Sequence, residues 1–232
     1  MQKEWPLLLL GWYDENKRQL PWREQTDAYR TWVSEVMLQQ TRVEAVKDYY
    51  RRFLERFPAI ENLAAATEEE VLQQWQGLGY YSRARNLWQG AKETVAQYGG
   101  EVPKDEKSLR ALPGVGEYTA GAILSIAYQQ AVPAVDGNVL RVFSRLYGLQ
   151  EEVQTTAAKK MVAKLVSDVL PAKRPGDFNQ ALMDFGAAIC IPETPRCEAC
   201  PVTSHCLARL QGQERILPVR KPKKPPTCIH VA

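Results

Sequence analysis

Glu35 and Asp136 are two acidic residues that adjoin apolar segments of the chain. Glu35 lies among the large apolar residues of segment 32–38, where burial would raise its pKa and let it act as a general acid near neutral pH. From position alone, a solvent-exposed glutamate in a first helical turn is the more common arrangement. Asp136 precedes a predicted helix, which is typical of an N-cap. Two carboxyls in unlike surroundings are the usual pair for breaking a glycosidic bond.

Four of the five cysteines cluster in one loop, at Cys190, Cys197, Cys200 and Cys206. No export signal is evident, so these thiols are expected to be reduced or to bind metal. Four thiolates suit either tetrahedral zinc or an iron–sulfur cluster, and their spacing does not distinguish the two. The fifth, Cys228, is expected to be an ordinary free thiol.

A glycine-rich turn spans residues 112–116, Leu-Pro-Gly-Val-Gly, between two short predicted helices. Gly114 and Gly116 allow the backbone to approach a ligand closely, and a helix starting near Gly116 would point free N–H groups at it. A phosphate would suit this position. A plain helical hairpin turn explains the same pattern.

Polar and aromatic side chains at two further boundaries, 39–41 and 77–81, could wedge between bases of a nucleic acid. Core packing of Tyr81 and surface exposure of Gln39 are the alternatives. Arg83, Arg85, Arg141 and Arg145 could neutralise phosphates, although scattered helical arginines usually lie on solvated faces.

Apolar residues recur at helical spacing along almost the whole chain, and period-two alternation is nearly absent, so an all-α fold is predicted. Proline and glycine mark the breaks between helices. The predicted helices are 3–15, 28–39, 43–57, 68–75, 80–97, 105–111, 116–128, 137–147, 156–170, 177–189 and 203–210.

The composition is that of a folded globular protein, with 232 residues, 45% hydrophobic and 25% charged residues. The net charge of +3 is too small to identify an anionic partner by itself. The leucines at 7–10 are too short a run for a signal peptide, and no segment is long enough to span a membrane, so a cytoplasmic location is expected. A proline-rich basic linker follows Leu217, and residues 227–231 alternate like the start of a strand.

Together these residues resemble the adenine DNA glycosylases of the MutY family, within the helix-hairpin-helix, endonuclease III-like superfamily. The match covers residues 5–210. Its distinctive segments are Leu20-Pro21-Trp22-Arg23, Ser34-Glu35-Val36-Met37-Leu38-Gln39-Gln40-Thr41, Gly77-Leu78-Gly79-Tyr80-Tyr81-Ser82-Arg83-Ala84-Arg85-Asn86, Leu112-Pro113-Gly114-Val115-Gly116, Val135-Asp136-Gly137-Asn138-Val139 and the four-cysteine loop.

The resemblance implies a role for each matching residue. Glu35 would protonate N7 of an extruded adenine and assist the water, Asp136 would stabilise the cationic sugar, and Tyr118 and Asn138 would orient the aspartate. Trp22 and Arg23 would form part of the adenine pocket, and Gln40 and Tyr80 would fill the gap near the opposite base, typically 8-oxoguanine or guanine. The remaining expected DNA contacts are Thr41, Leu78, Gly79, Arg83, Gly114, Val115 and Gly116. The four cysteines would bind a [4Fe–4S] cluster.

Tyr118 occupies the position where bifunctional glycosylase-lyases of the superfamily carry a lysine. A Schiff base needs an amine nucleophile, so a monofunctional enzyme that uses water is expected. A bifunctional glycosylase and AP lyase remains the first alternative, because Lys104 and Lys107 are near. A non-catalytic DNA-binding module with structural zinc is the second.

The family implies two all-α lobes with double-stranded DNA bound between them, and a monomer. Residues 24–130 would form a six-helix lobe with the hairpin, and residues 1–23 and 131–212 would form the iron–sulfur cluster lobe. Residues 213–232 would be a linker and the start of a Nudix-like domain. That domain would supply much of the preference for 8-oxoguanine. DNA in the bacterial nucleoid is the expected substrate.

Overall fold

The computed structural model describes residues 4–221, and within that range every regular element is a helix. The predicted all-α class is therefore confirmed. The helices are α1 (Trp5–Asn16), α2 (Ala28–Leu38), α3 (Val43–Arg56), α4 (Ile60–Ala65), α5 (Glu68–Trp75), α6 (Ser82–Tyr98), α7 (Glu106–Ala111), α8 (Glu117–Ile126), α9 (Gly137–Leu146), α10 (Thr156–Val169), α11 (Pro175–Ala188) and α12 (Leu207–Leu210), with 3-10 turns η1 (Pro21–Arg23), η2 (Cys197–Ala199) and η3 (Thr203–His205).

Apart from the short 3-10 turns η1 and η2, which were not predicted, the helices differ from the sequence expectation in two places. Helix α4 was not predicted, because its six residues offer just two buried positions, Ile60 and Leu63, too few for a periodic pattern. The predicted helix 203–210 is divided into η3 and α12, because the extended backbone of Cys206 separates them.

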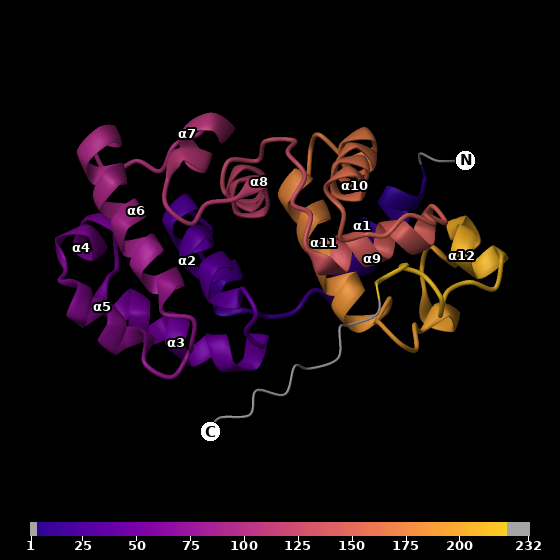
Figure 1. Ribbon diagram of the computed structural model, residues 1–232, viewed down its shortest axis with the longest axis horizontal. Coiled ribbons are helices and arrows are strands. Elements are labelled where there is room, and N and C mark those ends of the chain that lie inside the picture. Colours follow the sequence, from indigo (N-terminus) through magenta and orange to yellow (C-terminus); the bar gives the residue numbers. More distant parts are fainter. Residues whose placement is uncertain (1–3, 222–232) are drawn as a thin grey trace, which may run out of the picture.

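The helices form two lobes, each around its own apolar core (Figure 1). Helices α2–α8 surround the first core, in which Trp32, Phe53 and Trp75 are fully buried. Helix α1 joins α9, α10 and α11 around the second, where the Trp5 ring packs against Phe143 and Phe178. The segment 24–130 holds seven α-helices including α4, one more than the six expected.

Helices α8 and α11 pack together where the lobes meet, and an extended segment, 131–136, runs between them (Figure 1). A Cβ on Gly121 of α8 would lie 2.1 Å from the Pro133 carbonyl oxygen, so glycine is needed for this close approach. Fully buried Asn179 of α11 accepts from the Ala134 N–H at 3.2 Å and donates to Ser125 Oγ at 2.8 Å. These contacts fix the backbone that leads into Asp136.

The start of the predicted linker lies against the second lobe. Leu217 is buried, its carbonyl accepts from Arg145 Nε at 2.8 Å, and the Val153 N–H donates to the Val219 carbonyl at 3.3 Å. The predicted strand 227–231 and Cys228 lie outside the described residues. Between residues 4 and 221, no helix is both long and apolar enough to cross a membrane.

Candidate active site

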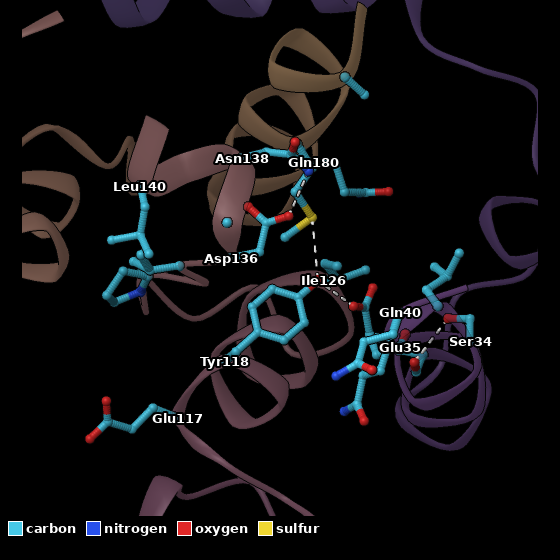
Figure 2. A pocket seen from close by; sticks show the side chains of 18 of the residues that line it. Ser34, Glu35, Gln40, Glu117, Tyr118, Ile126, Asp136, Asn138, Leu140 and Gln180 are labelled. Atoms are coloured by element: carbon cyan, nitrogen blue, oxygen red, sulfur yellow. Dashed lines mark hydrogen bonds between the residues drawn. The ribbon is translucent and has the colours of Figure 1, made fainter. Parts of the chain in front are cut away.

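A cleft of about 980 Å³ lies where the two lobes meet, lined by residues of both. Glu35 enters it from α2, Tyr118 from α8 and Asp136 from the start of α9, so α2 meets two helices that lie far from it in sequence (Figure 2). The expected catalytic residues Glu35, Asp136, Tyr118 and Asn138 all line this cleft, as do Trp22, Arg23, Gln40 and Thr41.

Glu35 is a buried residue of the last turns of α2, with 6% of its surface exposed. The expectation that Glu35 is a solvent-exposed residue in a first helical turn is therefore wrong. The helix begins at Ala28, where Asp27 caps it by accepting the Arg30 N–H at 2.7 Å. Desolvation by burial raises the pKa of Glu35 to about 7, against a smaller lowering by the Tyr118 hydrogen bond. Near neutral pH the carboxyl can therefore both hold and release a proton.

Tyr118, in the first turn of α8, donates its hydroxyl to Glu35 Oε2 at 2.5 Å (Figure 2). Burial raises the pKa of this phenol well above its usual value, so it stays a donor. The other Glu35 oxygen, Oε1, carries no side-chain or backbone hydrogen bond among residues 4–221, which leaves one carboxyl oxygen for a ligand.

Asp136 is the N-cap of α9, as its position predicts, and accepts the Val139 N–H at 2.8 Å. Its second oxygen accepts from Asn138 Nδ2 at 2.8 Å (Figure 2). Burial raises the pKa of Asp136, while these hydrogen bonds oppose the rise. Asn138 in turn accepts from Arg141 Nη2 at 2.9 Å, and Arg141 Nε donates to the Cys190 carbonyl at 2.8 Å. The aspartate is thus oriented by a chain of hydrogen bonds that ends at the cysteine loop.

Trp22 and Arg23 form one wall of the cleft from the turn η1. Trp22 is buried edge-on against Tyr50, and Arg23 pairs with Asp184 at 2.7 Å. Asp184 is buried and also pairs with Arg18. Sequence reasoning missed Asp184, although an acidic residue within the apolar run 181–185 of a helix was the same signal that identified Glu35.

The glycine-rich hairpin joins α7 to α8 as expected, with Gly114 at φ +75° and Gly116 as the N-cap of α8. A Cβ on Gly114 would lie 2.8 Å from Asn86 Cβ. Val115 is buried in the first core, so it anchors the turn from inside and leaves the two exposed glycines as the candidate ligand contacts.

The boundary loops 39–42 and 76–81 lie together in the first lobe. Gln40 and Tyr80 each have positive φ, 57° and 49°, a conformation that costs non-glycine residues roughly 1–2 kcal/mol. Tyr80 is 61% exposed, whereas Leu78 is buried and anchors its loop. Arg83 differs from the expectation of a phosphate contact, since its guanidinium donates to oxygens of both loops, including those of Thr41 and Gly79.

Arg141 and Arg145 are buried, with 5% and 2% exposure, so neither a phosphate contact nor a solvated face describes them. Arg145 donates to the carbonyls of Cys190, Ile191 and Pro192 and to Cys190 Sγ at 3.4 Å. Neither arginine has a carboxylate within ion-pair distance among residues 4–221. Within the described residues, these two buried cations beside the cysteine loop are therefore held by neutral oxygens and a sulfur and not by a direct ion pair.

The four cysteines of this loop line one small pocket together with Arg145. All four are half-buried thiols in this structure. Across the described part of the chain, no three cysteine, histidine or acidic side chains are grouped closely enough to hold a single metal ion. A donor set of four sulfurs beside two buried arginines fits a negatively charged thiolate-bound metal group, such as an iron–sulfur cluster.

The fold and the cleft correspond to a known class. Residues 33–171 match the model of the HhH-GPD superfamily of base excision DNA repair proteins. This match covers more than half of the chain, and the chain therefore belongs to that superfamily.

Relatives and solved structures agree with this assignment. The chain is 49% identical to the adenine DNA glycosylase of Mus musculus over 91% of this chain and 44% of the relative, and 38% identical to that of Buchnera aphidicola over 94% and 62%. A thermostable thymine-DNA glycosylase structure has a TM-score of 0.83 at 30% identity, over 90% of this chain and 96% of that one. An endonuclease III–DNA complex, with a TM-score of 0.76 at 24% identity over 91% and 99%, shares the fold. The chain spans about half the length of these curated relatives.

We expect the buried carboxyl of Glu35 to leave a signature in stability. A folded pKa raised from 4.5 to about 7 means that the unfolded chain ionises first, so this group destabilises the fold as pH rises between those values. Relative to Glu35→Gln, the wild type should lose about 2 kcal/mol of unfolding free energy between pH 5 and pH 8. Urea unfolding of both proteins at each pH measures this difference. A constant gap across the range would show that Glu35 is not desolvated.

Proposed function

We propose that this protein removes adenine from DNA by hydrolysing its N-glycosidic bond. The observation that carries the proposal is the cleft in which a carboxyl with a pKa of about 7 and a second, hydrogen-bonded carboxyl converge from two lobes. Curated relatives named adenine DNA glycosylase, at 38–49% identity over about 90% of this chain, support adenine as the base.

The two carboxyls have complementary tasks in such a reaction. Glu35, protonated near neutral pH, would deliver its proton to N7 of an adenine turned into the cleft, so that the base departs neutral. The carboxyl would then accept a proton from the attacking water. Tyr118 holds Oε2, so the proton transfer falls to Oε1.

Asp136 would stabilise the positive charge that develops on the sugar as the bond breaks. Its N-cap bond and the Asn138 amide fix both carboxylate oxygens, so the charge is placed before the substrate enters. In this division of roles Glu35 is the neutral acid and Asp136 is the anion. The assignment agrees with the greater burial of Glu35, because burial favours the neutral form of a carboxyl.

The residues of the site favour hydrolysis by water over the lyase reaction. Tyr118 stands at the start of α8 with its hydroxyl on the general acid, in the position where a Schiff-base lysine would be needed. Lys104 is an exposed side chain near Glu101 and does not line the cleft.

We further propose that the substrate is double-stranded DNA with adenine opposite 8-oxoguanine or guanine. Gln40 lines the cleft and exposed Tyr80 lies on the neighbouring loop, where both could replace the extruded base. The exposed glycines of the hairpin would contact a backbone phosphate.

The four cysteines would hold a [4Fe–4S] cluster in this proposal. When bound, the cluster would supply a negatively charged centre around which the loop folds, and it would take no part in hydrolysis. Its charge would compensate Arg145, which donates to Cys190 Sγ, and nearby Arg141. The rival of a non-catalytic module with structural zinc is less well supported, because the two carboxyls of the cleft, Glu35 and Asp136, have no role in it.

Glu35→Gln should abolish adenine excision while DNA affinity persists. The amide keeps the shape but has no proton to give, and loss of a general acid costs at least about 100-fold in rate. Single-turnover assays on an adenine:8-oxoguanine duplex measure the effect. For the wild type, the rate should fall as pH rises through about 7, because the acid form of Glu35 disappears. Exposed Glu44→Gln is the control, and wild-type excision by Glu35→Gln would refute the assignment.

Strand breaks should appear only after alkali treatment, because Tyr118 occupies the position where a Schiff-base lysine would be needed. Borohydride should therefore trap no stoichiometric covalent complex between the wild type and its product DNA. A Tyr118→Lys variant offers a positive comparison for the trapping chemistry. Efficient trapping of the wild type would show that another lysine serves and that the enzyme is bifunctional.

Protein purified anaerobically from an iron-replete host should contain iron and sulfide and little zinc. Cys197→Ser or Cys200→Ser should lower the iron content and the folded yield, because metal binding is coupled to folding of the loop. Cys228→Ser, outside the four-cysteine group, is the control. Stoichiometric zinc without iron would reject the cluster.

A further inference from the structure

The Arg83 guanidinium, at the start of α6, joins the two loops that carry Gln40 and Tyr80. Nη1 donates to the carbonyls of Val36 at 2.8 Å, Met37 at 3.1 Å and Gln39 at 2.5 Å. Nη2 donates to the carbonyls of Leu78 at 3.3 Å and Gly79 at 3.2 Å, and to Thr41 Oγ1 at 3.3 Å. One side chain thus contacts six oxygens, two from the end of α2 and four from the two loops.

This arrangement needs the planar fork of arginine. Each terminal nitrogen serves a separate group of acceptors, and all six are carbonyl or hydroxyl oxygens. The guanidinium also lies 5.4 Å from the Trp75 ring centroid and 5.5 Å from that of Tyr80. Lysine has one compact donor group and cannot bridge two sets of acceptors in this way. With both terminal nitrogens occupied and Nε buried, little of Arg83 remains to bind a phosphate.

Two of the acceptors lie directly before the residues whose backbone conformations shape the loops. The Gln39 and Gly79 carbonyls belong to the peptide groups that lead into Gln40 and Tyr80, the two residues with positive φ. Non-glycine residues keep that conformation when surrounding contacts impose it. The Val36 and Met37 carbonyls lie in the last turn of α2, so the guanidinium also binds the helix end that leads into the first loop.

We propose that Arg83 is a positioning residue that holds Gln40 and Tyr80 as one rigid unit for insertion into the duplex. It acts on extrusion of the base, and the bond-breaking step proceeds without it once the base is in the cleft. This inference rests on the proposed excision of a flipped base.

The test compares a substrate whose base must be extruded with one whose base is already unpaired. Arg83→Lys should slow single-turnover excision of adenine opposite guanine by about 10- to 100-fold, the scale of a small misplacement of a positioning group. The single-turnover rate of the same variant on adenine opposite a reduced abasic site should fall by less than about 3-fold relative to the wild type. Thr41→Val, which removes one acceptor and leaves the arginine, should show a smaller fall in the same direction.

Arg51→Lys is the matched control, since Arg51 is an exposed arginine of the same lobe, paired with Asp48 at 3.3 Å. The melting temperature of each variant separates loss of fold from loss of loop order. Equal loss on both substrates, or no loss on either, by folded Arg83→Lys would overturn the inference. If that variant does not fold, equal effects of Thr41→Val on both substrates, or none, would overturn it.

Fluorescence of 2-aminopurine at the target position gives a readout that needs no excision. In a Glu35→Gln background, binding should raise the fluorescence as the base unstacks, and adding Arg83→Lys should remove most of the rise. An undiminished rise would contradict the role of Arg83. Absence of adenine excision by the wild type would instead refute the proposed function, and the fluorescence comparison would still test the loops.

Discussion

Burial of the Glu35 carboxyl is the constraint on which the site depends. A carboxyl keeps its proton near neutral pH when it is desolvated, and here that requires two lobes to close around one side chain. The helix that carries Glu35 belongs to the first lobe and packs on α8, which in turn packs on α11 of the second. Gly121 and Asn179 hold the connecting segment against these helices. The stability lost through an ionised Glu35 is offset by the apolar cores on either side.

The second carboxyl is also partly desolvated, but it accepts more hydrogen bonds than Glu35 does. Asp136 lies at the same interface, but its oxygens accept a helix N-terminal N–H and a side-chain amide, which favour the anion. Two neighbouring acids thus differ because one faces a single phenol and the other faces several donors. The Asn138 amide is itself fixed by Arg141, whose position depends on the cysteine loop. The cysteine loop must therefore be ordered if Asp136 is to be held in the position that its role in the reaction requires.

Much of this could be predicted from sequence, and the failures have physical causes. Helical periodicity located most helices, and the N-cap role of Asp136 followed from its place before α9. Burial of Glu35 could not be deduced, because it depends on α8 and on contacts between distant segments. The arginines were misjudged for the same reason. Arg83, Arg141 and Arg145 resemble surface residues by spacing, yet each binds main-chain carbonyls from a remote segment, which local sequence does not encode.

These three arginines share a function within the architecture. Loops expose carbonyl oxygens that no helix satisfies, and a guanidinium can bind several of them at once. At Arg83 the loops satisfied are those that would enter DNA, and at Arg145 they are the cysteine loop and the segment at Leu217. Each arginine therefore orders a non-helical segment of the backbone. These segments present side chains and sulfurs in positions that a regular helix could not provide. Irregular segments carry the groups that would contact DNA and metal, while the helices supply the fixed frame, and buried arginines connect the two.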